Sequence, residues 1–482
     1  MMNKKTGFSY LKELFEQNSS KPFLYQFDSP TLSYGEFWDK AEQYAIRFAE
    51  LGLSFNDRIL IQLENSQNFL MLYLACAIGG YTACPIDPNM PEIRIKSVKD
   101  QLKPRYTCLD ANQSEWTAPP TTKLKLTREL ETGQESDFLI ILSSGTTGTP
   151  KGIIQTVTSI VESARSFANL AEHDESTVVY HHFPMFYMAG VFNLFFCPAV
   201  AGSRIVLGPR FSPIQMFKFW EIPRKMGVNH LTLTPTMAMT LTEFYRTDDS
   251  LLEHIGRYQA FVSTGSALYD SVAERFQKTF SVPLRSCYGV TEVGGSITLQ
   301  TWEEAMARDS VGRFSQEIRI IAGESAESAM ELRVKTPFMM RGYLFNGEVV
   351  QGVDSEGFFH TGDLGYIRNG SLFLTGREND LIKKGGEFVP LTMIEDLALR
   401  DHGILDAAAV AAPDDFWGNK IVLFYIPRPD QTLEEIERSL NDEFAKNLRK
   451  IEHPDKLIPV PRLPKTSIGK TIKRDLIKRY TI

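Results

Sequence analysis

Apolar and polar positions up to about residue 298 follow two alternating patterns, one typical of helices and one of buried strands. Residues 36–51 repeat apolar side chains at helical spacing and stop at Gly52, while Phe69–Ile78 is an apolar helical stretch followed by two glycines. This alternation predicts an α/β fold in which parallel sheets are covered by helices. The short apolar runs predicted as strands are 59–61, 82–86, 138–142, 204–207, 231–233 and 260–263.

The pattern changes after about residue 298. Residues 317–321 and 331–334 alternate polar and apolar side chains at period two, and another short apolar run follows at 371–374. Together they predict a small antiparallel sheet or β-barrel over residues 299–378.

The remainder of the chain has its own helix and strand patterns, at Met393–Arg400 and Ala407–Ala412. A small α+β C-terminal domain is therefore expected over residues 379–482, after an N-terminal domain that covers 1–378. The chain ends in a basic tail, for which a solvated helix is the expected structure.

Size and composition narrow the class of protein. A chain of 482 residues should form two or more domains. Its net charge of −7 argues against nucleic-acid binding, which needs a basic surface. There is no apolar stretch typical of a signal peptide and no run of 18 apolar residues that would span a membrane. The five scattered cysteines lack zinc-ligand spacing and fit buried free thiols in a reducing cytoplasm.

A glycine- and hydroxyl-rich segment follows the predicted strand 138–142. Its ten residues, Ser143–Gly152, contain three glycines, five hydroxyls and one lysine. Glycines allow the backbone to approach a polyphosphate, and the N–H groups, hydroxyls and lysine can bind its oxygens. A flexible surface turn is the alternative, but it explains the lysine poorly. The segment differs from a Walker A loop, because Pro150 precedes Lys151. The candidate phosphate-binding residues are Ser143, Ser144, Gly145, Thr146, Thr147, Gly148 and Lys151.

Four later segments carry polar groups suited to the same kind of ligand. Tyr288–Glu292 follows a strand-like run and offers an aromatic ring, a hydroxyl and a carboxylate. Asp363 is a carboxylate held between glycines and could accept ribose hydroxyls, although alone it could equally be a turn Asp. Arg377 supplies a planar cation, and Lys470 follows a glycine near the end of the chain. Each of these segments taken alone could be an ordinary loop.

Taken in order, these segments resemble the motifs of the adenylate-forming superfamily, which comprises acyl-CoA synthetases, luciferases and the adenylation domains of peptide synthetases. The resemblance extends over roughly residues 30–474 and is strongest to acyl-CoA synthetases. Besides the segments above, the motifs that carry it are Leu32–Glu36, Ile78–Tyr81, Pro85–Pro88, Phe183–Gly190, Ser263–Leu268, Ser310–Arg313 and Met340–Tyr343.

The resemblance implies a fold and a reaction. The N-terminal domain would contain two α/β subdomains and the small barrel, and the C-terminal domain would be mobile. ATP and a carboxylic acid would give an acyl adenylate and pyrophosphate, with Mg²⁺ as the metal. A thiol, from CoA or from the phosphopantetheine arm of a carrier protein, would then take the acyl group.

The resemblance also implies roles for individual residues. Lys470 would stabilise the charge on the α-phosphate, which Thr291 would contact. Glu292 would bind Mg²⁺. Asp363 and Arg377 would hold the ribose, and Arg377 is counted with the catalytic residues. Gly265, Ser266, Ala267 and Tyr288 would frame the adenine, and Gly289 is counted with the cofactor-binding residues. The substrate pocket would include Phe186, Tyr187, Gly190, Gly265 and Gly289.

Two departures from the family pattern concern the hinge and the pocket. The usual hinge position holds Asn379, followed by Asp380, where the family commonly has Asp or Lys. Asn tolerates unusual backbone angles, so a hinge at these two residues is still expected. Tyr187 occupies the place where many family members have a His beside the acyl group.

Several functions remain open within this resemblance. Lys384–Val389 resembles the segment of acyl- and aryl-CoA ligases, and Phe183–Gly190 lacks the acidic residue that binds an amino acid's amino group, so a CoA ligase for a fatty or aryl acid is favoured. The alternatives are an enzyme that loads an acyl carrier protein and a catalytically silent nucleotide-binding homologue. Oxidation of the luciferase type has no feature in its favour.

Overall fold

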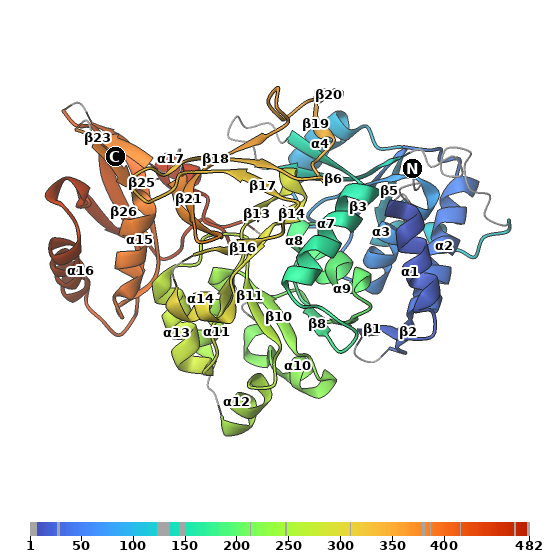
Figure 1. Ribbon diagram of the computed structural model, residues 1–482, viewed down its shortest axis with the longest axis horizontal. Helices are drawn as coiled ribbons and strands as arrows, with labels where there is room; N and C mark the ends of the chain where they lie inside the picture. Colours follow the sequence, from blue (N-terminus) through green and yellow to red (C-terminus); the bar gives the residue numbers. More distant parts are fainter. Residues whose placement is uncertain are drawn as a thin grey trace.

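The computed structural model describes residues 7–26, 29–122, 135–143, 151–212, 214–245, 248–308, 310–377, 381–385, 387–414, 416–466 and 469–479. A large N-terminal part lies on the right in Figure 1 and a small C-terminal part on the left. The predicted mixed α/β fold, with a large N-terminal and a small C-terminal domain, is confirmed. The boundary predicted at 378/379 falls outside the described residues.

The first sheet has seven strands in the order β20-β19-β7-β6-β4-β3-β5. The four strands β3 to β6 are mutually parallel, whereas β7, β19 and β20 continue the sheet in antiparallel fashion. The strands are β3 (Arg58–Gln62), β4 (Thr82–Pro85), β5 (Tyr106–Leu109), β6 (Asp137–Ser143), β7 (Lys151–Thr156), β19 (Gly342–Phe345) and β20 (Glu348–Val350).

The position of β19 and β20 differs from the expectation that residues 299–378 form one separate sheet. Gly342, Tyr343 and Leu344 pair with Ile154, Ile153 and Gly152 of β7. The physical reason is that β7 would otherwise be an edge strand with unpaired backbone groups. Leu344 is fully buried there, next to Ile140 and Ile154.

The second sheet also has seven strands, in the order β12-β11-β10-β8-β9-β1-β2, and only the β1–β2 pair is antiparallel. The strands are β1 (Pro22–Gln26), β2 (Leu32–Ser33), β8 (Val178–His181), β9 (Arg204–Leu207), β10 (His230–Leu233), β11 (Ala260–Ser263) and β12 (Arg285–Ser286). The helical segments that follow β9 in the sequence include η3 (Met216–Lys218, a 3₁₀ turn), α10 (Glu221–Met226), α11 (Pro235–Phe244), α12 (Asp249–Ile255), α13 (Asp270–Phe280) and α14 (Trp302–Ala307).

The main core lies around the helix α3 (Gln67–Gly79), in which every residue from Phe69 to Gly79 is buried. This helix packs on α2 (Tyr34–Glu50), whose start is fixed by a capping box between Ser33 and Glu36. Other helical segments around the first sheet and this core are α1 (Gly7–Gln17), α4 (Glu92–Leu102), η1 (Asp110–Asn112), α5 (Gln113–Trp116), α7 (Val157–Leu170), α8 (Met188–Val191) and α9 (Cys197–Val200).

The aromatic stretch after residue 186 belongs mostly to this core. A π-helical turn, η2 (Phe192–Phe196), buries Phe195 against Phe23 and Phe37 from the N-terminal elements. Phe196 packs edge-on against Phe138 of β6. These rings therefore join the two seven-stranded sheets.

The small antiparallel sheet or barrel expected after residue 298 is a six-stranded antiparallel sheet in the order β15-β16-β22-β21-β18-β17. Its strands are β15 (Thr298–Leu299), β16 (Gly312–Phe314), β17 (Arg319–Ile321), β18 (Met330–Lys335), β21 (Phe359–Arg368) and β22 (Ser371–Arg377). A small hairpin of β13 (Gly289–Val290) and β14 (Gly295–Ser296), joined by η4 (Thr291–Val293), precedes it.

The C-terminal part has a hairpin, β23 (Leu381–Lys384) with β24 (Glu387–Pro390), and a three-stranded sheet in the order β25-β26-β27. The strands of this sheet are β25 (Ile404–Asp414), β26 (Gly418–Pro427) and β27 (Lys456–Pro459). The helical segments are α15 (Leu391–Arg400), α16 (Leu433–Asn447), η6 (Lys450–Glu452) and α17 (Lys473–Arg479). The helix α17 is less solvated than expected, because Leu476 is fully buried against the sheet.

Two further expectations concern the whole chain. All five cysteines are free and buried, as predicted. Among the described residues, no helix combines the length and the apolar character needed to traverse a membrane.

Candidate active site

Asp363 is the centre of a buried polar cluster. The antiparallel register of β21 and β22 places Asp363 opposite Arg377, whose Nε donates to Oδ1 at 2.5 Å. The hydroxyl of Tyr288 donates to Oδ2 at 2.8 Å. Asp363 is only 4% exposed, so both donors are needed to compensate its buried charge.

Tyr288 keeps its proton in this cluster. Burial raises the pKa of its hydroxyl well above the ordinary value, and the charge of Asp363 raises it further. The phenol is therefore a permanent donor to the carboxylate, and its ring is held at the β13 end of the cluster.

Thr291 and Glu292 lie in the turn η4 and are fixed through their backbone. Gln155 Nε2 donates to the carbonyl of Thr291 at 2.6 Å, and Met340 N donates to that of Glu292 at 2.9 Å. The Tyr343 hydroxyl donates to Glu292 Oε1 at 2.9 Å. Two distant segments of the large domain thus orient the carboxylate.

Burial raises the pKa of Glu292, and hydrogen bonds from its own backbone and from Tyr343 oppose that rise only in part. The charge of Arg377 lowers this pKa, while that of Asp363 raises it. A carboxylate that is undercompensated in this way fits a cation as an additional partner. Within the part of the chain that the structure describes, no group of three or more His, Cys, Asp or Glu residues could hold a metal ion.

Lys151 stands at the first position of β7, opposite Ser143 at the end of β6. Its Nζ lies 5.3 Å from the centroid of the Tyr343 ring, as in a cation–π contact. The other five predicted phosphate-binding residues, from Ser144 to Gly148, lie outside the described residues. Tyr343 therefore contacts both Lys151 and Glu292, a role that the sequence did not indicate, although Tyr343 belongs to the motif Met340–Tyr343.

The predicted adenine-binding turn follows β11. Gly265 has a φ of +90°, in the region that favours glycine, and Ser266 and Ala267 are exposed beyond it. Gly289 faces the other strand of its hairpin so closely that a Cβ would lie 2.0 Å from the Gly295 oxygen. Both glycines thus permit backbone geometry that a side chain would prevent.

The predicted pocket residues Phe186, Tyr187 and Gly190 differ in their surroundings. Tyr187 is the N-cap of α8. Burial raises the pKa of its hydroxyl, the charge of Arg377 lowers it and that of Glu292 raises it, so Tyr187 lies within electrostatic reach of the cluster. Gly190, in contrast, is packed against backbone, since a Cβ there would lie 2.3 Å from the Pro184 oxygen. Phe186 is partly buried against the main core.

Lys470 belongs to a C-terminal segment that touches the large domain. Thr236, in the first turn of α11, donates its hydroxyl to the Gly469 carbonyl at 3.0 Å. The backbone N–H of Lys470 donates to Thr466 Oγ1 at 3.1 Å. The predicted hinge residues Asn379 and Asp380 lie outside the described residues.

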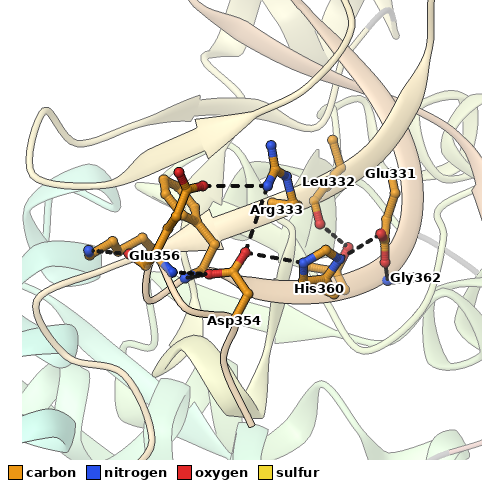
Figure 2. A network of polar contacts seen from close by, with 10 residues as sticks. Glu331, Leu332, Arg333, Asp354, Glu356, His360 and Gly362 are labelled. Carbon is orange, nitrogen blue, oxygen red and sulfur yellow. Dashed lines mark hydrogen bonds and ion pairs between the residues drawn. The ribbon is translucent and has the colours of Figure 1, made fainter.

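A charged network supports the strand that leads into Asp363 (Figure 2). His360 contacts Glu331 Oε2 through Nδ1 at 2.8 Å and Asp354 Oδ2 through Nε2 at 3.3 Å. Glu331 Oε1 in turn accepts from Gly362 N at 3.1 Å. Arg333 also pairs with Asp354 and with Glu356, each at 3.7 Å. The sequence analysis did not single out this network.

Two protein-family models match this chain. Residues 11–344 match the model of the AMP-binding enzyme family, and residues 393–470 match that of the AMP-binding enzyme C-terminal domain. The chain therefore belongs to the AMP-binding enzyme family, and the family predicted from the ordered motifs is confirmed.

Individual relatives align over nearly the whole chain. The 2-succinylbenzoate–CoA ligase of Oceanobacillus iheyensis is 24% identical over 94% of this chain and 95% of its own length. The 4-coumarate–CoA ligase 1 of Arabidopsis thaliana is 24% identical over 97% and 91%. Among solved structures, ATP-bound MatB from Rhodopseudomonas palustris has a TM-score of 0.86 at 20% identity and covers 99% of both chains, which shows a shared fold.

Replacing Gly289 by Ala should displace the β13–β14 hairpin, because the new Cβ would also lie 2.5 Å from Ser296 Cα. We expect destabilisation of about 1–3 kcal/mol, the usual cost of overpacking, and weaker AMP binding. Thermal unfolding and AMP titration measure the two effects. Gly256→Ala is the matched control, since its nearest contact would be 3.4 Å. Equal stability of the two variants would contradict this account of Gly289.

The His360 network should make stability depend on pH. The hydrogen bond to Glu331 raises the pKa of His360, burial lowers it, and Asp354 raises it. Since the pKa is raised by folding, the stabilisation is complete below the unfolded value of about 6.5 and is lost as pH rises through the folded pKa.

We therefore expect His360→Gln to lower the melting temperature most at acidic pH, with a difference from the unsubstituted protein that shrinks by about pH 8. Melting curves across this range test the prediction, and His402→Gln, at an exposed histidine, is the control. A difference that stays constant with pH would show that the charge of His360 is not the cause.

Proposed function

We propose that this protein is an AMP-forming acid–thiol ligase that activates a carboxylic acid with ATP and transfers the acyl group to CoA. Membership of the AMP-binding enzyme family is the observation that carries this proposal. The two CoA ligases that align over most of the chain support CoA as the acceptor.

The polar cluster suits a bound nucleotide. Asp363 and Arg377 would hold the ribose hydroxyls, since a carboxylate accepts from them and a guanidinium donates. Tyr288 and the turn Gly265–Ala267 would enclose the adenine. Lys151 would bind the β- and γ-phosphates together with Thr146 and Thr147.

Glu292 is the residue suited to a magnesium ion. Its undercompensated carboxylate fits Mg²⁺, which proteins commonly bind through one or two carboxylates together with substrate phosphates. When bound, the ion would neutralise phosphate charge. The backbone contacts to Gln155 and Met340 and the Tyr343 hydroxyl would keep the carboxylate in place for it.

In the first half-reaction, a carboxylate oxygen of the acid would attack the α-phosphorus, and the bond to pyrophosphate would break. Negative charge then gathers on the α-phosphate oxygens, where Lys470 would stabilise it and Thr291 would donate a hydrogen bond. Because the acid is already ionised, the step needs no general base.

In the second half-reaction, a thiol would attack the acyl carbonyl and AMP would leave. Lys470 would have no task in this step, and the thiol would need access to the carbonyl. The C-terminal domain would therefore move on the hinge at Asn379 and Asp380, so that other residues face the large domain.

A phosphopantetheine arm on a carrier protein is the second candidate acceptor. The exposed residues Arg474 and Lys478 of α17 would favour an acidic partner. For either acceptor we place the reaction in the cytoplasm, since five buried free thiols suit a reducing compartment.

The direct test is ATP–pyrophosphate exchange with Mg²⁺, run over a panel of fatty, aryl and amino acids. We expect exchange with a fatty or an aryl acid, followed by thioester formation when CoA is added. Acyl transfer to a carrier protein but not to CoA would favour the second acceptor. ATP binding without exchange for any acid would contradict the proposal and favour a silent nucleotide-binding homologue.

Lys470→Ala should lower the exchange rate by about 10²–10³-fold, the loss typical when one group that stabilises a developing anion is removed. Thioester formation from a supplied acyl adenylate should stay near the rate of the unsubstituted protein. Lys446→Ala, at an exposed lysine of α16, is the control. Equal losses in both half-reactions would remove Lys470 from the assigned role.

A further inference from the structure

The contact between the two domains is polar and specific. In Figure 1 the helix α15 of the C-terminal domain lies beside α13 of the large domain. Several hydrogen bonds and ion pairs cross between the domains. They join Glu243 to Arg428 through both carboxylate oxygens, Ser271 to Asp396, and Arg275 to the carbonyls of Leu399 and Asp401.

Glu395, on α15, joins three elements at one buried carboxylate. Its side chain is only 4% exposed. Oε1 accepts from the backbone N–H of Ala409 at 2.7 Å and pairs with Lys473 Nζ at 3.0 Å. Oε2 accepts from the hydroxyl of Tyr269, which belongs to the large domain. The Glu395 carboxylate therefore connects the large domain, strand β25 of the C-terminal sheet and helix α17.

The two side chains that Glu395 connects each lie next to a segment of the proposed site in the sequence. Tyr269 is the N-cap of α13 and follows the proposed adenine turn Gly265–Ala267. Lys473 begins α17, three positions after Lys470. A carboxylate fixed between them links the nucleotide end of the large domain to the segment that carries the proposed catalytic lysine.

A second contact restrains the same segment from its other side. Thr236 donates to the Gly469 carbonyl, and a Cβ at Gly469 would lie 2.9 Å from Thr236 Cβ. Gly469 also has a φ of +86°, which favours glycine. Lys470 thus lies between two contacts to the large domain, one at the preceding residue and one through Lys473 and Glu395.

We propose that Glu395 is a positioning residue for adenylation: by binding Tyr269 across the domain interface and Lys473 at the start of α17, it orients Lys470 towards the nucleotide. This inference rests on the function proposed above, because it assigns Glu395 to the first half-reaction only. It adds Tyr269, Glu395 and Lys473 to the residues on which that step depends.

The arrangement also suits a contact that must break during each cycle. A buried carboxylate left without partners is costly, but Ala409 and Lys473 belong to the same domain as Glu395 and move with it. Of these three partners of Glu395, the Tyr269 hydroxyl is the one that is lost when the domains separate, and water can replace it. The contact therefore favours one orientation of the domains and still allows them to part.

Tyr269→Phe tests the interdomain bond, because it removes the hydroxyl and retains the ring that packs between the domains. We expect exchange to slow by about 10-fold, the order of one lost charge-assisted hydrogen bond, with little change in thioester formation from a supplied acyl adenylate. Tyr425→Phe is the matched control, since it removes a Tyr–Glu hydrogen bond contained within the C-terminal domain.

Lys473→Met tests the other side of the carboxylate. It should slow exchange in the same way, and the double variant with Tyr269→Phe should lose less than the product of the two single losses, because both act through Glu395. Losses that multiply independently, or equal losses in both half-reactions, would overturn the proposal.

A measurement of domain orientation separates this inference from the proposed function. Spin labels at Ser97→Cys on α4 and Ser439→Cys on α16 report the distance between the domains, since both serines are exposed and the native cysteines are buried. We expect a broader distance distribution for Tyr269→Phe than for Tyr425→Phe. If no acid supports exchange, the proposed function fails while this comparison still applies; identical distributions would overturn the positioning role.

Discussion

The need to compensate one buried carboxylate organises the proposed active site. Asp363 is almost fully buried, and its charge is balanced by Arg377 from the neighbouring strand and by the phenol of Tyr288 from another hairpin. Arg377 and Tyr288 are therefore held in place, because moving either one would leave the buried charge of Asp363 without a donor. Arg377 lies two positions before the predicted hinge residue Asn379, so the same ion pair fixes the strand that leads towards it. Glu395 plays a comparable part across the domain interface, again as a buried carboxylate with donors from several elements.

The sequence predicted the elements whose pattern is local. The strand before the hydroxyl-rich segment, the buried helix predicted at Phe69–Ile78 and the alternating strands after residue 298 all appear, because burial on both faces or on one face leaves a periodic pattern in the chain. The π-helical turn at Phe192–Phe196 and the burial of Leu476 were not predictable in this way, because packing between distant elements determines them.

For the site, the motifs indicated which residues matter but not how they contact one another. Asp363 and Arg377 meet because of a strand register, which no spacing rule gives. Tyr343 contacts both Glu292 and Lys151, which lie 51 and 192 positions away along the chain. Glu395 gave no signal, since a single acidic residue in an amphipathic helix is usually solvated. Contacts over such separations depend on the tertiary fold, and they are what the structure adds to the motifs.

The pairing of β19 with β7 has a consequence for the order in which the chain can fold during synthesis. The first seven-stranded sheet is built mostly from residues before 157, but its outer strands are supplied by residues 342–350. Until the ribosome has released that later segment, β7 presents unpaired backbone N–H and C=O groups at an open edge, the feature through which nascent chains pair wrongly. Residues 157–341 must therefore be synthesised while this edge is still unpaired, so the edge of the first sheet is covered only late in translation.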